Sequence, residues 1–188
     1  MKIRFEELSF KYDNTPVQRN VLESLNFEIL EHDFVGIIGA SGSGKRTLIQ
    51  HFTGLLQPSS GRVLIDGQEL NSAGMDLGDL RTRIGIVFQF PESQLFEETV
   101  YADVAFGPQN MGLSEAEVHD RVEESLRLVG LDADHFSKRS PFHLSEGEKR
   151  RVAIAGVIAM NPDVLILDEP TACLDPEGIR IIEEILRG

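Results

Sequence analysis

A glycine-rich stretch, GASGSGKRTL at residues 39–48, carries residue types that hold phosphate groups. Gly39, Gly44 and Lys45 fit the pattern GxxxxGK followed by Ser or Thr, in which backbone N–H groups cradle phosphates and the hydroxyl holds Mg²⁺. The next residue here is Arg46, whose guanidinium cannot accept a metal ion. The hydroxyl of Thr47, one residue later on a helix, points about 100° away. The stretch therefore predicts a phosphate site whose metal position is altered.

Two adjacent carboxylates, Asp168 and Glu169, follow an apolar run in VLILDEPT at 164–171. At the carboxyl end of a buried strand, where α/β folds bind ligands, the first acid can help to hold Mg²⁺. The second acid, Glu169, can orient or deprotonate a water molecule. By themselves the two acids fit a solvated acidic turn equally well. Their combination with the glycine-rich stretch favours a nucleotide site.

A third segment, LSEGEKRRVAIAG at 144–156, places Ser145 at an apparent helix start. A hydroxyl and free N–H groups at such a position can receive an anion. The alternative is an ordinary capped helix with a basic first half. On physical grounds alone the capped helix is the preferred interpretation.

Short strands and helices have to position these groups. Strand patterns cover residues 2–12, 21–30, 62–67 and 84–89, and two nearly continuous apolar runs predict buried strands at 34–39 and 164–168. Helical spacing covers 45–56, most of 98–130, about 145–160 and 176–186. Ser114 and Glu117 form a predicted capping box, and Pro176 fits the first turn of the last helix. Strands alternating with helices predict an α/β fold on a mostly parallel sheet.

The composition limits the classes of function. The chain has 188 residues, of which 18 are basic and 31 acidic, and the net charge of −13 disfavours broad attraction to nucleic acid or anionic lipid. No apolar run approaches the roughly 20 residues that cross a bilayer, so work at a membrane would need a partner. The single cysteine, Cys173, cannot form an internal disulfide and fits a reducing compartment.

Five motifs lie in the order and approximate spacing found in ATP-binding cassette (ABC) ATPases: GASGSGKRTL, Gln89 in VFQFPESQLF, LSEGEKRRVAIAG, VLILDEPT and ACLD. The resemblance covers nearly the whole chain. Within that family, the segment FQFPESQLFEETVYADVAFGPQNMGL at 88–113 and the LSEGEKRRVAIAG segment most resemble the ATPase subunits of energy-coupling-factor (ECF) transporters, which include cobalt and nickel uptake systems.

The resemblance implies an α/β P-loop NTPase fold. We expect a RecA-like parallel-sheet core, an N-terminal antiparallel β subdomain and an inserted helical subdomain, with the C-terminal part of the family fold missing. Residues 1–188 then form a single ABC ATPase domain. The expected parts are the β subdomain at 1–33 with 61–75, the nucleotide-binding core at 34–60, 76–90 and 157–188, and the helical subdomain with the signature motif at 91–156.

The resemblance also assigns roles to residues. Tyr12 matches the aromatic residue that stacks on adenine, and the phosphate cradle comprises Gly39, Ser41, Gly42, Ser43, Gly44, Lys45, Arg46 and Thr47. Asp168 and Gln89 match metal ligands, and the implied catalytic residues are Glu169, Lys45 and Gln89. Ser145 and Gly147 match the signature that binds the γ-phosphate of ATP held by the opposite subunit, and Asp175 matches the D-loop at the dimer interface.

The implied function is that of an ATP-binding and ATP-hydrolysing subunit, with ATP and Mg²⁺ as cofactors, that energises an importer of a vitamin or a transition-metal ion. Two subunits would close on ATP and reopen after hydrolysis. The expected partners are a second ATPase subunit, identical or paralogous, and transmembrane transporter subunits, with no nucleic acid. The expected location is cytoplasmic and peripheral, on the inner face of the cell membrane, with membrane contact only through partners.

The sequence departs from the family pattern at four places. Arg46 replaces the Ser that binds Mg²⁺, Glu146 stands where the signature has its first Gly, and Cys173 replaces a small Gly of the D-loop. The carboxylate of Glu146 would approach a triphosphate, and at about 4 Å its repulsion from one phosphate charge is about 4 kcal/mol at an effective dielectric of about 20. The chain also ends at Gly188, before the family's switch histidine, so we expect it to be truncated.

These departures leave an alternative open: a nucleotide-binding module with impaired hydrolysis, caused by Arg46, Glu146 and the missing histidine. An ABC ATPase that acts on DNA or ribosomes is a third, weaker hypothesis. The acidic charge and the transporter-like segment at 88–113 argue against it.

Overall fold

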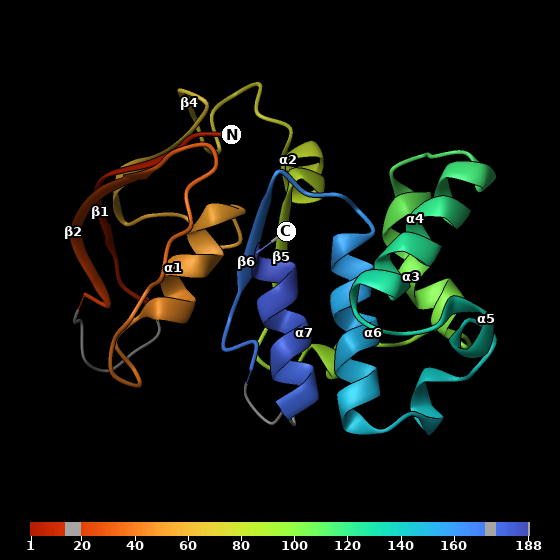
Figure 1. Cartoon of the computed structure of the whole chain (residues 1–188). Coiled ribbons are helices and arrows are strands. Elements are labelled where there is room, and N and C mark those ends of the chain that lie inside the picture. The colour runs from red at the N-terminus through yellow and green to blue at the C-terminus, as the bar shows by residue number, and fades with distance from the viewer. Residues whose placement is uncertain (14–19, 172–175, 188) are drawn as a thin grey trace. The chain divides into compact units, whose positions relative to one another are not determined.

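The computed structural model describes residues 1–13, 20–171 and 176–187. The chain divides into two compact units, Met1–Ile84 and Gly85–Gly188, drawn from red to yellow-green and from there to blue in Figure 1.

The first unit contains a four-stranded sheet in the order β2-β1-β3-β4. Its strands are β1 (Ile3–Phe10), β2 (Leu22–Ile29), β3 (Ser60–Ile65) and β4 (Gln68–Glu69), and all three pairings are antiparallel. In β1, Phe5 lies opposite Phe27 of β2 and Val63 of β3. The predicted N-terminal antiparallel sheet is therefore confirmed.

Two helices accompany this sheet. They are α1 (Lys45–Phe52) and α2 (Leu77–Arg83), and the Asp76 side chain caps α2 by accepting hydrogen bonds from its first N–H groups. The ring of Phe52 on α1 packs 4.8 Å from the ring of Phe5 on β1. The helix predicted at 45–56 is thus present but ends at Phe52, and α2 was not predicted.

The buried strand predicted at 34–39 is wrong. Residues 34–39 adopt no regular secondary structure, and Phe34 and Ile38 are 76% and 98% exposed. A strand forms only where neighbouring strands accept and donate its backbone hydrogen bonds. In the part of the chain that the structure describes, the two sheets consist of β1–β4 and β5–β6, so this apolar run pairs with no strand.

The second unit combines two paired strands with helices. The strands are β5 (Ile84–Val87), which begins at the boundary, and β6 (Val164–Leu167). The helices are η1 (Pro91–Gln94), α3 (Val100–Asn110), α4 (Glu115–Leu128), α5 (Ala133–Phe136), η2 (Pro141–His143), α6 (Glu146–Ile158) and α7 (Pro176–Arg187). The strand predicted at 164–168 exists, but β6 is only half-buried.

The ends of the helices agree with the local signals in the sequence. The capping box predicted at Ser114 and Glu117 is confirmed at the start of α4, and Pro176 is the first residue of α7. The helical stretch predicted within 98–130 consists of two helices, because a turn containing Gly112 separates α3 from α4.

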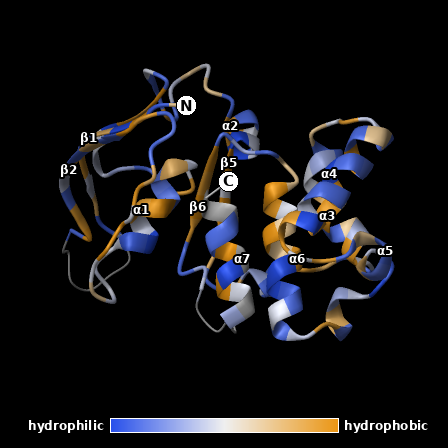
Figure 2. Cartoon of the chain, in the orientation of Figure 1, coloured by the Kyte–Doolittle hydropathy of each residue, from blue (hydrophilic) through white to orange (hydrophobic). Residues whose placement is uncertain are grey.

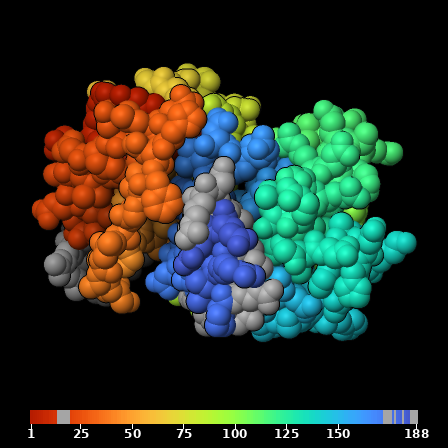
Figure 3. All heavy atoms as spheres, viewed as in Figure 1, coloured from red at the N-terminus to blue at the C-terminus, as the bar shows by residue number. Residues whose placement is uncertain are grey.

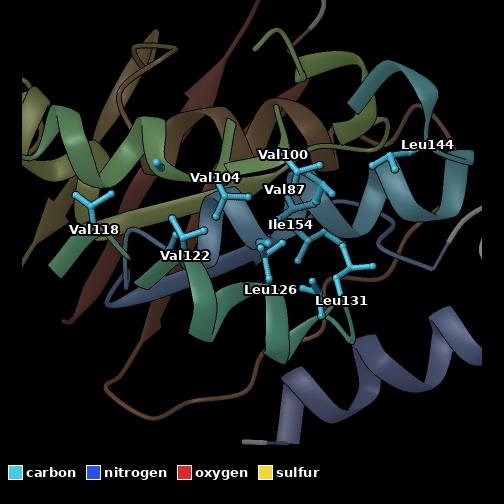
Figure 4. Packing of buried hydrophobic residues seen from close by; sticks show 14 of the residues in the cluster. Val87, Val100, Val104, Val118, Val122, Leu126, Leu131, Leu144 and Ile154 are labelled. Carbon is cyan, nitrogen blue, oxygen red and sulfur yellow. The ribbon is translucent and has the colours of Figure 1, made fainter. Parts of the chain in front are cut away.

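Helices α3, α4 and α6 share one apolar core. Val104 of α3, Val122 and Leu126 of α4 and Ile154 of α6 are fully buried and point toward one another (Figure 4). In Figure 2 the apolar stretches of α3 and α6 are orange where these helices lie side by side, whereas α4 is mostly blue. Figure 3 shows green and teal atoms of α4 and α5 at the surface on this face. This shared core holds α6 in place against α3 and α4.

Replacing Leu126 with alanine should destabilise the second unit. Leu126 is 0% exposed, whereas Leu128, on the same helix, is 40% exposed. We expect Leu126→Ala to lower the free energy of unfolding by about 2–5 kcal/mol through lost burial and a residual cavity. Leu128→Ala, the matched control, should cost about 0.5 kcal/mol or less. Urea unfolding followed by circular dichroism measures both, and equal losses would contradict the assigned core.

Candidate functional site

The glycine-rich loop is held by its own lysine. Lys45 Nζ donates hydrogen bonds to the backbone oxygens of Gly39 at 2.8 Å and Ala40 at 3.0 Å. Gly42 and Gly44 have φ angles of 77° and 92°, in the left-handed region that glycine adopts without strain. The loop therefore curls back toward the lysine at the start of α1.

The N-terminus of α1 is open to an anion. Gly44 occupies the N-cap position, no side chain caps the helix, and its first turn contains no acidic residue. The first N–H groups of a helix have no partner within the helix, and the helix dipole places partial positive charge there. Ser41, Gly42 and Ser43 are exposed beside it. This arrangement fits a phosphate group.

The two residues after Lys45 have different surroundings. Arg46 is exposed, whereas Thr47 is 7% exposed and its Oγ1 lies 3.1 Å from the phenolic oxygen of Tyr12. The ring of Tyr12 packs edge-on against Phe10 at 4.9 Å and keeps 40% of the residue exposed. Tyr12 and the start of α1 are thus brought together, and the Thr47 hydroxyl is engaged by Tyr12.

In the second unit, the glutamine after β5 and the acids after β6 lie close together. Gln89 Nε2 donates a hydrogen bond of 2.6 Å to Glu169 Oε2. The backbone N–H of Asp168 donates to the carbonyl oxygen of Val87 at 2.9 Å, and Asp168 is buried. The pairing of β5 with β6 therefore joins the predicted base, Glu169, to the predicted glutamine.

The LSEGEKRRVAIAG segment starts α6 with a complete capping box. Ser145 Oγ donates to Glu148 Oε2 at 2.8 Å and accepts from the Glu148 N–H at 3.3 Å. Hydrogen bonds from the backbone and the hydroxyl of Ser145 lower the pKa of Glu148. Glu146 forms an ion pair of 2.7 Å with Lys149. The capped helix that physical reasoning preferred is present, and anion binding by Ser145 stays a prediction.

Of the remaining positions singled out in the sequence, the structure describes Gly147. A Cβ added at Gly147 would meet nothing within 4 Å, so packing does not require glycine there. Asp175 and Cys173 lie outside the described residues.

Sequence reasoning missed Arg150. This residue of α6 is buried, and its Nη2 donates a hydrogen bond of 2.9 Å to the backbone oxygen of Glu169. The available signal was its spacing, because Arg150 lies four residues before the buried Ile154, on the same face of a helix. A charged residue on an apolar face indicates a specific polar partner.

The residues fit Mg²⁺ only in part. Asp168 and Gln89 carry carboxylate and amide oxygens, which are ligand types that Mg²⁺ accepts. The segment contributes no hydroxyl at position 46, and the hydroxyl at position 47 is hydrogen-bonded to Tyr12.

Among the described residues, no helix combines the length and the apolar character needed to cross a bilayer.

The chain is similar to a protein family and to solved structures of the same fold. The model of the ABC transporter family matches residues 22–172. The structure of cbiO1 from Clostridium perfringens, part of the ABC transporter complex cbiONQ, superposes with a TM-score of 0.85 at 43% identity, covering 98% of this chain and 72% of that one. A dimeric, post-hydrolysis ATP-binding cassette bound to ADP and Pi has a TM-score of 0.83 at 30% identity, covering 97% and 81%.

Curated relatives are similar over almost the entire chain. The energy-coupling factor transporter ATP-binding protein EcfA2 of Clostridioides difficile is 55% identical over 179 residues, covering 95% of this chain and 62% of the relative. The protein of the same name from Symbiobacterium thermophilum is 54% identical over 189 residues, covering 100% and 65%. The chain thus spans a little under two thirds of the length of these relatives. With its P-loop NTPase fold, it belongs to the ABC transporter family.

Proposed function

We propose that this chain supplies the ATP-binding and ATP-hydrolysing part of an ECF-type importer. The observation that carries the proposal is the similarity to ECF transporter ATP-binding proteins at 50–55% identity over 179 residues. The preformed loop around Lys45 and the Gln89–Glu169 contact support the same function. The solute would be a vitamin or a transition-metal ion.

Each group has a distinct task in the proposed cycle. Tyr12 stacks on adenine, and the backbone N–H groups of residues 42–47 with Lys45 bind the phosphates. Glu169 accepts a proton from the attacking water, and Gln89 orients that water and holds the Glu169 carboxylate through the bond that they share. Ser145 and Gly147 bind the γ-phosphate of ATP carried by a second subunit, and Asp175 contacts that subunit.

Such a subunit works with partners. A second ATPase subunit, identical or paralogous, completes the sites, and transmembrane subunits carry the solute. The cytoplasmic face of the cell membrane is the location that these partners require. Reconstitution of the whole protein with an ECF transmembrane subunit in vesicles tests the proposal: solute uptake should require ATP. Uptake that is equally fast without ATP would contradict the proposal.

We propose that Mg²⁺ binds together with ATP and that Asp168 and Gln89 would be its protein ligands. When bound, Mg²⁺ supplies positive charge to the phosphate oxygens of the nucleotide. In the first turn of α1, the exposed Arg46 stands where the family pattern has the hydroxyl ligand, and it carries a permanent positive charge.

Replacing Arg46 with serine should therefore change how nucleotide binding depends on Mg²⁺. We expect Arg46→Ser to bind ATP about 10-fold more tightly with Mg²⁺ than with EDTA, one hydroxyl ligand having been restored, whereas the parent should differ by about 3-fold or less. Calorimetric titration with ATP measures the dissociation constants. Arg62→Ser, at a distant exposed arginine of β3, is the control and should behave as the parent. Equal Mg²⁺ dependence of the Arg46 variant and the parent would contradict this assignment.

A further inference from the structure

A buried cation of α6 contacts the residue that we propose as the base. Arg150 is 3% exposed, and its Nη2 donates a hydrogen bond of 2.9 Å to the backbone oxygen of Glu169. A guanidinium stays charged at every pH at which proteins fold, so its burial costs free energy that only polar contacts offset. An uncharged side chain could fill the same space at lower cost. The buried cation therefore indicates that the backbone of Glu169 needs the hydrogen bond that Arg150 donates.

The backbone of Glu169 needs such a partner. Its φ angle is 53°, in the left-handed region, which a residue with a Cβ adopts only at a cost in free energy. Conformations of this kind persist where the surroundings hold them, and they concentrate at functional sites. The carbonyl that Arg150 binds belongs to this strained residue.

The other end of Glu169 is held as well. Gln89 Nε2 donates to Glu169 Oε2 at 2.6 Å, so one hydrogen bond fixes the carboxylate and another fixes the main chain. The direction of the side chain depends on the backbone from which it projects. A change of the peptide unit at Glu169 would therefore turn the carboxylate away from Gln89.

We infer that Arg150 is a positioning residue for hydrolysis: it holds the main chain of Glu169 in the left-handed conformation and thereby aims the base. The inference rests on the proposed role of Glu169. Arg150 belongs to the same helix as the signature residues, whose cap is Ser145. A side chain of this helix thus contacts the main chain of the proposed base.

Arg121 offers a matched control. Its Nη1 donates to the backbone oxygens of Ala159 at 3.2 Å and Met160 at 3.0 Å, immediately after α6. It makes the same kind of contact between a guanidinium and carbonyl oxygens, and no contact with Glu169 is among those described for it. Loss of a purely structural arginine is thus represented by Arg121→Met.

The test compares steady-state ATP hydrolysis of the purified parent with Arg150→Met, Arg150→Lys and Arg121→Met. We expect Arg150→Met to lower kcat about 10- to 100-fold, with the KM for ATP changed less than about 3-fold. The reason is that displacing a catalytic group by about 1 Å slows the reaction more than it weakens substrate binding. Arg150→Lys, which keeps a donor and the charge, should recover part of the loss. Arg121→Met should lower the unfolding midpoint with kcat within about 2-fold of the parent.

A double variant separates positioning from general damage. If Arg150 acts through Glu169, adding Arg150→Met to Glu169→Gln should reduce single-turnover hydrolysis by less than about 2-fold more, because the base is already absent. Losses that multiply would overturn the inference. So would a folded Arg150→Met protein with the kcat of the parent. If the Met variant does not fold, Arg150→Lys is combined with Glu169→Gln and judged by the same criterion.

Amide hydrogen exchange tests the anchor without turnover. The N–H of Asp168, which donates to Val87 at 2.9 Å next to Glu169, should exchange at least about 10-fold faster in Arg150→Met than in the parent, and at the parental rate in Arg121→Met. A parent that hydrolyses no ATP would refute the proposed function, and these rates would then decide the inference alone. Unchanged exchange in Arg150→Met would overturn it.

Discussion

Replacing Lys45 with alanine is expected to weaken ATP binding by about 10- to 100-fold. The ammonium group lies against the carbonyl oxygens of Gly39 and Ala40, where the loop closes in front of α1. A hydrogen bond to a charged group contributes about 1.5–3 kcal/mol, and 1.4 kcal/mol corresponds to a tenfold change in the dissociation constant. Removal of the side chain takes away both the charge that faces the phosphates and the bonds that order the loop.

Isothermal titration with ATP measures this loss directly. Lys2→Ala is the matched control, because Lys2 forms an exposed ion pair of 3.0 Å with Glu28, on the sheet of the same unit. It should bind ATP with the affinity of the parent, since exposed ion pairs contribute little. Parental affinity in Lys45→Ala would remove the basis for every role assigned to the loop.

Replacing Glu169 with glutamine should abolish most turnover while nucleotide binding is retained. Glutamine has the same shape and can still accept the hydrogen bond from Gln89, but it cannot take a proton from water. A positioned general base contributes about 10²- to 10⁴-fold in rate. We therefore expect kcat to fall by about this factor, with the affinity for ATP within about 3-fold of the parent.

Release of phosphate under saturating ATP measures the change in kcat. Glu124→Gln is the control, because Glu124 pairs with Arg127 on the exposed side of α4 at 2.6 Å. Its rate should equal that of the parent. Should Glu169→Gln hydrolyse ATP as fast as Glu124→Gln, another group must be the base, and the role inferred for Arg150 would fail as well.

At the start of α6, the observed capping box and the proposed binding of a γ-phosphate both need the Ser145 hydroxyl. The capping box occupies the Ser145 hydroxyl with the Glu148 carboxylate, and Glu146 adds a second acid paired with Lys149. An incoming γ-phosphate would need the hydroxyl to turn away from Glu148. The hydrogen bonds from Ser145 lower the pKa of Glu148 and so favour the charged form that accepts them, and phosphate binding would compete with this cap.

The sequence by itself determined the local features of this protein. Both capping boxes, at Ser114 and Ser145, depend on partners three residues away, and the glycine-rich loop closes on a lysine within six residues of the carbonyls that it binds. Hydrogen bonds over such short separations follow from residue type and spacing, because few chain conformations have to be excluded to form them. The helical spacing of residues 98–130 and 145–160 likewise predicted helices where α3, α4 and α6 form, although the core that they share was found only in the structure.

Tertiary structure decided what distant segments do. The apolar run at 34–39 resembles a buried strand, but it remains exposed because burial depends on strands that pair with it, and its own letters cannot supply them. Gln89 and Glu169 are 80 residues apart in the chain, and Arg150 and Glu169 are 19 apart. Contacts of this kind exist only after β5 pairs with β6 and α6 packs on its core, so the arginine behind the base became visible only in the folded chain.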